Sequence, residues 1–196
     1  MTAATPGTFL LPSLALILAF FVASCQSTSS GQAANTAKGE EYYTQFSLFQ
    51  ERNRHLTTNY RRGILVPINT KVTFMNKSGK AINVKEASGT VLNLVNVPDY
   101  SGEDINGIFN RTFSKQPVDL SGFTESEQRN IKNGTVALGM SKDAVVRALG
   151  YPPKHETPSL ESNHWRYWAH RFKTYMVSFQ DGKVSKVEPP HQMEGQ

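Results

Sequence analysis

Two histidines and one serine have the types and spacing that come closest to a catalytic or metal-binding pattern in this chain of 196 residues. His164 and His170 fall on the same side of a predicted strand. Six residues at ~3.3 Å each place them ~20 Å apart, which is too far for one metal ion. Ser141 precedes Asp143, whereas a nucleophile elbow requires glycine two residues after the serine. The sequence therefore predicts a protein that is not an enzyme and that needs no metal or cofactor.

Cys25 is the only cysteine, and its surroundings predict a covalent modification. It ends the sequence Val22-Ala23-Ser24-Cys25, which follows an apolar run of roughly 15 residues, a length typical of a signal peptide and short for a membrane span of ~20. The four residues resemble a bacterial lipobox, in which small side chains fit the peptidase and the thiol receives diacylglycerol. We expect cleavage between Ser24 and Cys25, and acyl chains such as palmitate on Cys25. The alternative is a buried or reactive cysteine behind an uncleaved apolar segment.

The residues around this motif indicate a compartment. Residues 1–24 are predicted to be a lipoprotein signal peptide, and residues 25–39 have the Ser-, Ala-, Thr-, Gln- and Gly-rich composition of a flexible tether. Gln26 follows the cysteine, and the absence of aspartate there favours the outer membrane, by resemblance to enterobacterial sorting. The net charge of +5 is scattered along the chain, so anionic lipids are a better match for it than nucleic acid. We expect a lipid-anchored protein of the bacterial outer membrane that faces the periplasm.

Residues 40–122 are predicted to form a small module of a β-meander and a helix. The first part, from Glu40 toward Tyr60, is predicted to begin as a helix because aromatic residues recur on neighbouring turns. The period then changes to two, which is typical of strands. The predicted strands cover Thr70 to Phe74, Ala81 to Glu86 and Val91 to Val97. A helix from Ser101 to Ser114 follows, with Ser101 and Asp104 in the spacing of a capping box.

Residues 123–190 contain the clearest local signals. A capping box of Thr124 and Glu127 predicts the start of one helix, and Gly134 predicts its end. Ser141 predicts the cap of a second helix that continues to Leu149, and Gly150 is expected to end it in the left-handed conformation. The strands that follow are predicted over Asn163–Phe172, Lys173–Gln180 and Lys183–Val187. The turn Asp181-Gly182 joins the last two as a hairpin.

Several of these motifs together resemble a known family. The stretch G-M-S-K-D-A-V, the later L-G-Y-P, the strand W-R-Y-W and the hairpin F-Q-D-G-K-V look like the SmpA/OmlA (BamE-like) family of outer-membrane lipoproteins. The resemblance covers about the last 70 residues. It implies two helices packed on a three-stranded antiparallel sheet. The predicted fold class is therefore α+β, with this C-terminal unit preceded by the small β-meander and helix.

The resemblance also implies a function. It suggests a non-catalytic scaffold or interaction module for outer-membrane β-barrel assembly or envelope integrity. The expected partners are membrane lipids, through acylated Cys25, and envelope proteins such as the β-barrel assembly machinery. Arg166, Trp168 and Arg171 have the composition of interface anchors. The alternatives are a periplasmic binding or inhibitor module and a peptidoglycan-binding envelope sensor.

Overall fold

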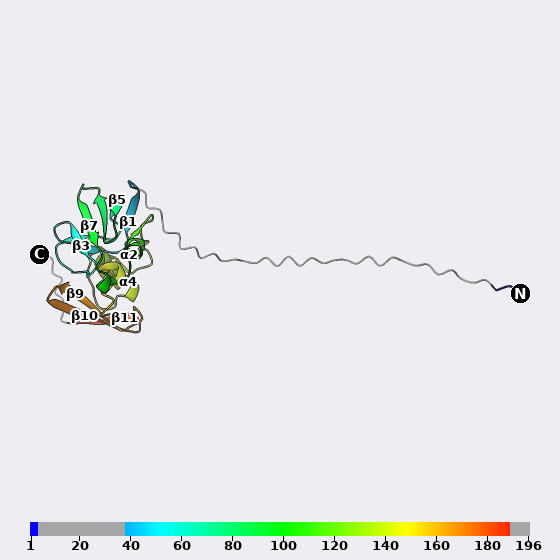
Figure 1. The fold of residues 1–196 in the computed structure, drawn as a ribbon. Helices are drawn as coiled ribbons and strands as arrows, with labels where there is room; N and C mark the ends of the chain where they lie inside the picture. The colour runs from blue at the N-terminus through cyan, green and yellow to red at the C-terminus, as the bar shows by residue number, and fades with distance from the viewer. Residues whose placement is uncertain (4–37, 189–196) are drawn as a thin grey trace. The chain divides into compact units, whose positions relative to one another are not determined.

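The computed structural model of the protein describes residues 1–3 and 38–188 (Figure 1). Ser24 and Cys25, on which the predicted cleavage and lipidation fall, lie outside the described residues, as does nearly all of the predicted signal peptide and tether. Within the described ranges, no helix is long and apolar enough to cross a membrane.

The largest sheet of the described chain has six strands, in the order β3-β7-β6-β5-β1-β8. These strands are β1 (Glu41–Thr44), β3 (Arg54–Leu56), β5 (Lys71–Lys77), β6 (Ala81–Glu86), β7 (Val91–Val95) and β8 (Phe113–Ser114). The antiparallel meander β5-β6-β7 is the part that the period-two pattern predicted, and it is confirmed. Strand β3 pairs with β7 in parallel, so the sheet is mixed. Two further strands, β2 (Leu48–Gln50) and β4 (Ile64–Val66), pair in an antiparallel sheet of their own.

Two short helices follow the meander, α1 (Pro98–Ser101) and α2 (Ile105–Thr112). The prediction of one helix over Ser101–Ser114 with Ser101 as its cap is therefore wrong at its start. Asp104 is the N-cap of α2, because its carboxylate accepts a hydrogen bond from the backbone N–H of Gly107 at 2.8 Å. The apolar stripe of α2 packs in the core beneath the six-stranded sheet.

The C-terminal elements are α3 (Glu125–Asn133), α4 (Lys142–Leu149), β9 (His164–His170), β10 (Lys173–Gln180) and β11 (Lys183–Glu188). The three strands form an antiparallel sheet in the order β11-β10-β9. The predicted capping box of Thr124 and Glu127 and the N-cap at Ser141 are confirmed. Asp181 and Gly182 both have positive φ, 51° and 74°, as the turns of two-residue hairpins require.

The described residues 38–188 belong to one compact unit, in which two hydrophobic cores are joined. One core packs α3 and α4 against the three-stranded sheet around Trp165 and Tyr167. The other packs α2 against the six-stranded sheet around Ile82 and Phe109. Tyr151 contacts both cores. In Figure 1, α2 and α4 lie between the two sheets.

The predicted fold class is wrong. The described chain has eleven strands and four helices, and its largest sheet is the six-stranded mixed one, rather than a two-helix, three-strand unit preceded by a small meander and helix. The elements after residue 123 do not pack only on one another. The backbone N–H of Ser47 donates to the Arg147 carbonyl at 2.9 Å, and the Arg147 guanidinium donates to the Gln45 carbonyl at 3.0 Å. Helix α4 is therefore also hydrogen-bonded to the segment between β1 and β2.

The predicted helix from Glu40 toward Tyr60 is also wrong, because β1, β2 and β3 occupy this segment. The strands have only three or four residues each, so they are too short to show a period of two. Their partners are far along the chain: Tyr43 pairs with Ser114, and His55 pairs with Leu94. Such pairing depends on the tertiary fold and leaves no local pattern in the sequence.

Gly150 ends α4, although not in the left-handed conformation that was predicted. Its φ is 72° but its ψ is −170°, a region that is essentially restricted to glycine. A Cβ at this position would lie 2.9 Å from the ring of Phe46. Glycine is thus needed here for two reasons: it adopts this backbone conformation, and it lets Phe46, in the segment after β1, pack closely against the end of α4.

A buried arginine joins the C-terminal ends of α3 and α4. The Arg61 guanidinium donates to the carbonyl oxygens of Gly134 at 2.5 Å, Leu149 at 3.1 Å and Ala148 at 3.3 Å. It also lies 4.5 Å from the centre of the Phe49 ring. Burial lowers the pKa of this guanidinium from its ordinary value. Its partners are carbonyl dipoles at two helix C-termini, where a positive charge is favourable.

Glu127 joins the opposite ends of the same two helices. Its carboxylate accepts hydrogen bonds from the backbone N–H of Thr124 at 3.0 Å and of Ser141 at 2.8 Å, which are the N-caps of α3 and α4. Burial alone would raise the pKa of Glu127, but these hydrogen bonds outweigh it and lower the pKa to about 2. The two helices therefore point in the same direction, with a negative charge at their N-termini and a positive charge at their C-termini.

We predict that Arg61→Met lowers the free energy of unfolding by about 3 kcal/mol, because the buried carbonyls of Gly134 and Ala148 lose the donor that Arg61 supplies, while Leu149 keeps only Asn59. Arg62→Ala is the matched control. Arg62 pairs with Glu51 at 2.7 Å on the surface, and its loss should cost about 1 kcal/mol or less. Urea-induced unfolding of the purified variants measures both values. Equal, small losses in the two variants would contradict the role given to Arg61.

We also predict that the protein loses stability as the pH falls from about 4.5 toward 2. The unfolded chain protonates Glu127 near the ordinary value of 4.5, whereas the folded protein keeps the carboxylate charged down to about 2. The contribution is complete above 4.5 and disappears as the pH drops through this window. Thermal unfolding measured at several pH values should show a shallower decline in Glu127→Gln than in the parent protein. An unchanged decline in that variant would contradict this role.

Candidate interaction surface

Of the three residues predicted as interface anchors, Arg166 and Trp168 lie on β9 and Arg171 lies in the turn directly after it. Arg166 and Trp168 point to the side of the strand opposite the buried Trp165 and Tyr167, as the alternation of the strand predicts. Arg171 lies in the turn after β9, with its guanidinium 5.2 Å from the centre of the Phe172 ring. Phe172 is 83% exposed, so this turn presents an apolar ring to solvent.

Trp168 is half-buried rather than exposed, because residues distant in the sequence surround it. Its ring centre is 6.5 Å from that of Tyr60 and 6.5 Å from that of Tyr100. We call these three rings the aromatic cluster. Each ring is partly accessible, and none belongs to the two hydrophobic cores. The cluster therefore combines residues from three separate parts of the chain on one surface.

Charged side chains border the aromatic cluster. Glu156 lies 3.4 Å from the guanidinium of Arg166 and 3.7 Å from the imidazole of His155. The His155 ring in turn packs against Tyr100, with 4.5 Å between ring centres. The cluster thus has an apolar centre and a border that can form ion pairs and hydrogen bonds, an arrangement typical of protein interfaces.

The segment that carries Tyr60 is held by its two neighbours. The backbone N–H of Arg61 donates to the carbonyls of Trp168 and Ala169, both at 3.2 Å, and so covers the edge of β9. Asn59 has a positive φ of 55°, and its amide donates to the carbonyls of Leu149 at 2.7 Å and Tyr151 at 3.0 Å. Tyr60 therefore lies between two buried polar anchors, which place its ring beside Trp168.

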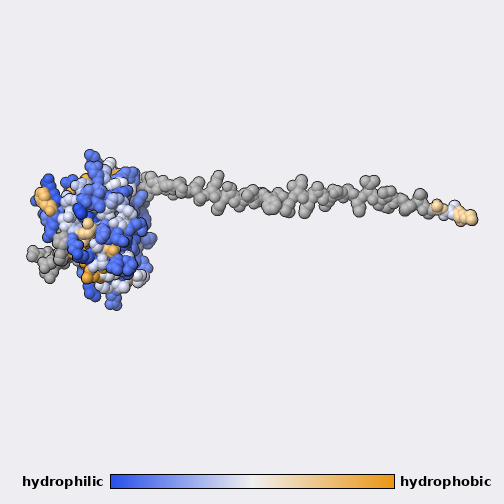
Figure 2. Space-filling view, turned by 90° about the horizontal axis from the view of Figure 1, so that it is seen from below, coloured by the Kyte–Doolittle hydropathy of each residue, from blue (hydrophilic) through white to orange (hydrophobic). Residues whose placement is uncertain are grey.

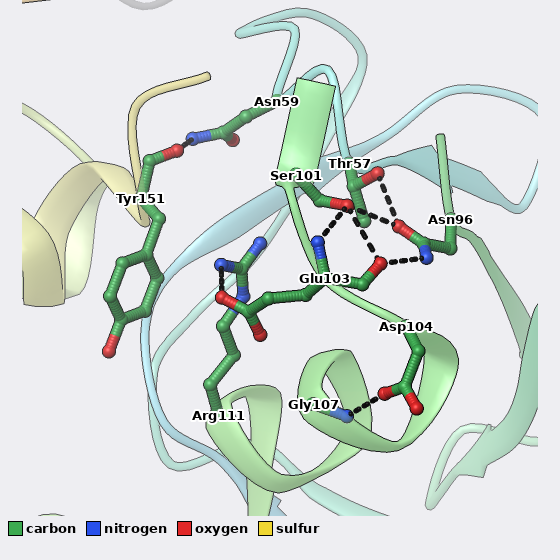
Figure 3. A network of polar contacts seen from close by, with 9 residues as sticks. All are labelled: Thr57, Asn59, Asn96, Ser101, Glu103, Asp104, Gly107, Arg111 and Tyr151. Carbon is green, nitrogen blue, oxygen red and sulfur yellow. Dashed lines mark hydrogen bonds and ion pairs between the residues drawn. The ribbon is translucent and has the colours of Figure 1, made fainter. Parts of the chain in front are cut away.

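A second polar network holds Ser101, the residue that follows Tyr100 in the chain (Figure 3). Asn96 accepts hydrogen bonds from the hydroxyls of Thr57 at 3.1 Å and Ser101 at 2.7 Å, and it donates to the carbonyl of Glu103 at 2.8 Å. The same Glu103 pairs with Arg111 of α2 at 2.6 Å. Because Thr57 precedes Tyr60 and Ser101 follows Tyr100, one amide group connects the two segments that supply the tyrosines.

The other residues considered for chemistry do not assemble into a site. His164 lies beside the hydroxyl of Ser178 at 3.1 Å, and His170 accepts a hydrogen bond from the backbone of Phe172 at 3.3 Å. Ser141 caps α4. Among residues 1–3 and 38–188, no group of three or more His, Cys, Asp or Glu side chains could hold a metal ion.

Hydrophobic residues are sparse on the face seen in Figure 2, where they form small separate patches within a mainly hydrophilic surface. The described large hydrophobic residues with the greatest exposure, besides Met1, are Ile64, Leu138 and Phe172. They come from three different loops or strand ends. The face seen in Figure 2 therefore shows no extended apolar patch among the described residues.

Sequence reasoning did not find Tyr60, Tyr100 or His155. They lie in segments without a periodic pattern, and Tyr60 and Tyr100 are 108 and 68 positions away from Trp168, the residue of β9 that they contact. The only local signal was the alternation in β9, which identified Arg166 and Trp168 as lying on the outer side. The sequence therefore located the part of the surface that β9 supplies, but it did not locate the part that Tyr60, Tyr100 and His155 supply.

Comparison of the chain with protein-family models, with curated proteins and with solved structures gives no significant match. The resemblance to the SmpA/OmlA family therefore stays a prediction that rests on the motifs quoted above.

The buried side chain of His55 makes the stability of the fold depend on pH. It is buried on β3, and its Nδ1–H donates to the carbonyl of Phe49 at 2.8 Å. Burial lowers the pKa of His55 from 6.5 to about 4, the hydrogen bond to Phe49 opposes the shift, and the charges of Arg61 and Arg111 add to it. The folded protein therefore keeps this imidazole neutral at pH values at which the unfolded chain takes up a proton.

We predict a loss of stability between about pH 6.5 and 4, and the variant His55→Gln should lack it. The neutral imidazole contributes its full stabilisation above pH 6.5. This stabilisation is lost as the pH falls toward the pKa of about 4 in the folded protein. Chemical unfolding at half-unit intervals of pH measures the effect. If the parent protein and the variant show the same slope in this window, His55 does not have the proposed role.

Proposed function

We propose that the chain is a lipid-anchored protein of the bacterial outer membrane that acts as a non-catalytic interaction module on the periplasmic side. Support for the anchor is the sequence Val22-Ala23-Ser24-Cys25 behind its apolar run. The observation that carries the interaction role is the aromatic cluster of Tyr60, Tyr100 and Trp168. Trp, Tyr and Arg are the residues most enriched at the energetic centres of interfaces.

The way in which the cluster is held supports this proposal. Two buried networks, through Arg61 and through Asn96, fix the backbone on either side of the cluster. Rings that are already ordered lose little conformational freedom when a partner binds, so more of the contact energy appears as affinity. Arg166 and His155 at the border can add polar contacts that orient the partner.

The first partner to test is the machinery that assembles outer-membrane β-barrels, as the motif resemblance suggests. An inhibitor module that captures a soluble periplasmic protein and a sensor that binds peptidoglycan are the alternatives. Co-purification of one soluble protein in equal amount favours the inhibitor. Sedimentation with purified sacculi favours the sensor.

We predict that Trp168→Ala reduces recovery of the partner complex about tenfold or more when the tagged full-length protein is purified from its native membranes in mild detergent. The lost ring leaves a gap at the centre of the cluster, so the contacts of both tyrosines weaken. Leu138→Ala is the matched control, because Leu138 is an apolar side chain that is 71% exposed and lies on the loop between α3 and α4. Arg166→Ala tests the border in the same way.

A further variant, Cys25→Ser, separates the anchor from the surface. We expect it to leave the membrane fraction and to lose the membrane-bound partner even though its aromatic cluster is intact. Full recovery of every partner by both Trp168→Ala and Arg166→Ala would exclude this surface. Membrane retention of Cys25→Ser would exclude the lipid anchor.

A further inference from the structure

A pocket with an excess of arginine lies beside the aromatic cluster. It has a volume of about 350 Å³ and is lined by Phe49, Glu51, Arg52, Arg54, Leu56, Tyr60 and Arg62. This volume is in the range of small-molecule sites. Three arginines and one glutamate give its lining a formal charge of +2 (3 − 1). The pocket shares Tyr60 with the aromatic cluster but is otherwise separate from it.

Among the described residues, ion pairs do not balance the charges of the pocket lining. Glu51 pairs with Arg62 at 2.7 Å. Arg52 and Arg54 are exposed, and neither forms an ion pair with any carboxylate of the described residues. Two guanidinium groups in the lining of the pocket therefore remain available for a ligand. The planar guanidinium fork binds phosphate or carboxylate oxygens through two parallel hydrogen bonds.

Backbone geometry fixes one wall of the pocket. Glu51 and Arg54 exchange two backbone hydrogen bonds, at 2.9 and 3.1 Å, around a two-residue turn. Both turn residues have positive φ, 53° at Arg52 and 62° at Asn53. Asparagine and glycine adopt positive φ readily at both turn positions, whereas arginine does so only at a cost in free energy. The arginine at position 52 thus disfavours the turn while it adds a charge to the pocket rim.

The other walls are held as firmly. The carbonyl of Phe49 accepts the hydrogen bond from buried His55, and the Phe49 ring lies over the Arg61 guanidinium. At Gly63, a side chain would collide with the carbonyl of Gln50, so only glycine brings Arg62 to Glu51. A site that is rigid before binding loses little free energy when it orders its ligand.

We propose that this pocket binds a phosphate group carried on a small organic molecule. Phosphate matches the local charge, because a phosphate monoester carries about two negative charges at neutral pH. Arg52 and Arg54 would bind its oxygens, while Phe49, Leu56 and Tyr60 would contact the carbon atoms attached to it. The phosphate can come from a free phosphate ester or from the head group of an anionic phospholipid. This inference does not depend on the partner protein proposed above.

Calorimetric titration of the full-length protein with glycerol phosphate tests the proposal. We expect saturable binding that weakens about tenfold or more in the double variant Arg52→Asn, Arg54→Gln, because two charge-assisted contacts are lost. Arg129→Gln is the matched control, since Arg129 is exposed on α3 outside the pocket. It removes a positive charge and should leave the affinity unchanged.

A second variant separates binding from folding. Arg52→Asn alone should raise the midpoint of thermal unfolding, because asparagine suits the left-handed turn, and at the same time lower the affinity for glycerol phosphate. A residue with only a structural role could not produce these opposite changes. An increase in stability with unaltered affinity would overturn the assignment of Arg52.

Vesicles distinguish the two sources of phosphate. In the Cys25→Ser background, which removes the acyl chains, co-sedimentation with phosphatidylcholine vesicles that contain phosphatidylglycerol, absent with phosphatidylcholine alone and abolished in the double variant, assigns the site to a lipid head group. Binding of glycerol phosphate without co-sedimentation assigns it to a soluble ester. No saturable binding to either probe, or an equal loss in Arg129→Gln, would overturn the proposal.

Discussion

The buried charge of Arg61 is the constraint on which much of this structure depends. A guanidinium removed from water is stable only where dipoles or charges compensate it, and here the carbonyls at the ends of α3 and α4 do so. Both helices must therefore end at the same place and point the same way, with Glu127 at their opposite ends. The segment that bears Arg61 cannot move without exposing those carbonyls, so its neighbours Tyr60 and Arg62 are fixed in turn.

Local signals predicted the elements whose stability is local. The cap at Ser141, the capping box at Thr124, the Asp181-Gly182 turn and the meander β5-β6-β7 depend on residues within a few positions of one another, and all were found where expected. The strands β1 to β3 were not predicted, because their partners lie up to about 70 residues away. The mixed six-stranded sheet follows from these distant pairings, which is why the expected fold class was wrong.

The residues of the aromatic cluster also include some that local sequence predicts and others that depend on distant parts of the chain. Alternation along β9 predicted that Arg166 and Trp168 face away from the core, and this needed no knowledge of the fold. The sequence could not predict that Trp168 is half-buried beside Tyr60 and Tyr100. Buried hydrogen-bond networks place the segments that carry these two tyrosines beside Trp168, although both are distant from it in the sequence. The resemblance at the C-terminus covers β9 but neither tyrosine, so it could indicate only part of the surface.

The central claim is that the described residues 38–188 unfold as one cooperative unit, and that the contacts of buried Arg61 with the C-terminal ends of α3 and α4 stabilise all of it. Native-state hydrogen exchange of the parent protein and Arg61→Met measures this directly, because it reports opening free energies for each segment. The account predicts that the central amides of β6 and of β10 exchange with the same free energy, and that the variant lowers both by the same amount. Different free energies in the parent protein, or a loss confined to β10, would contradict it.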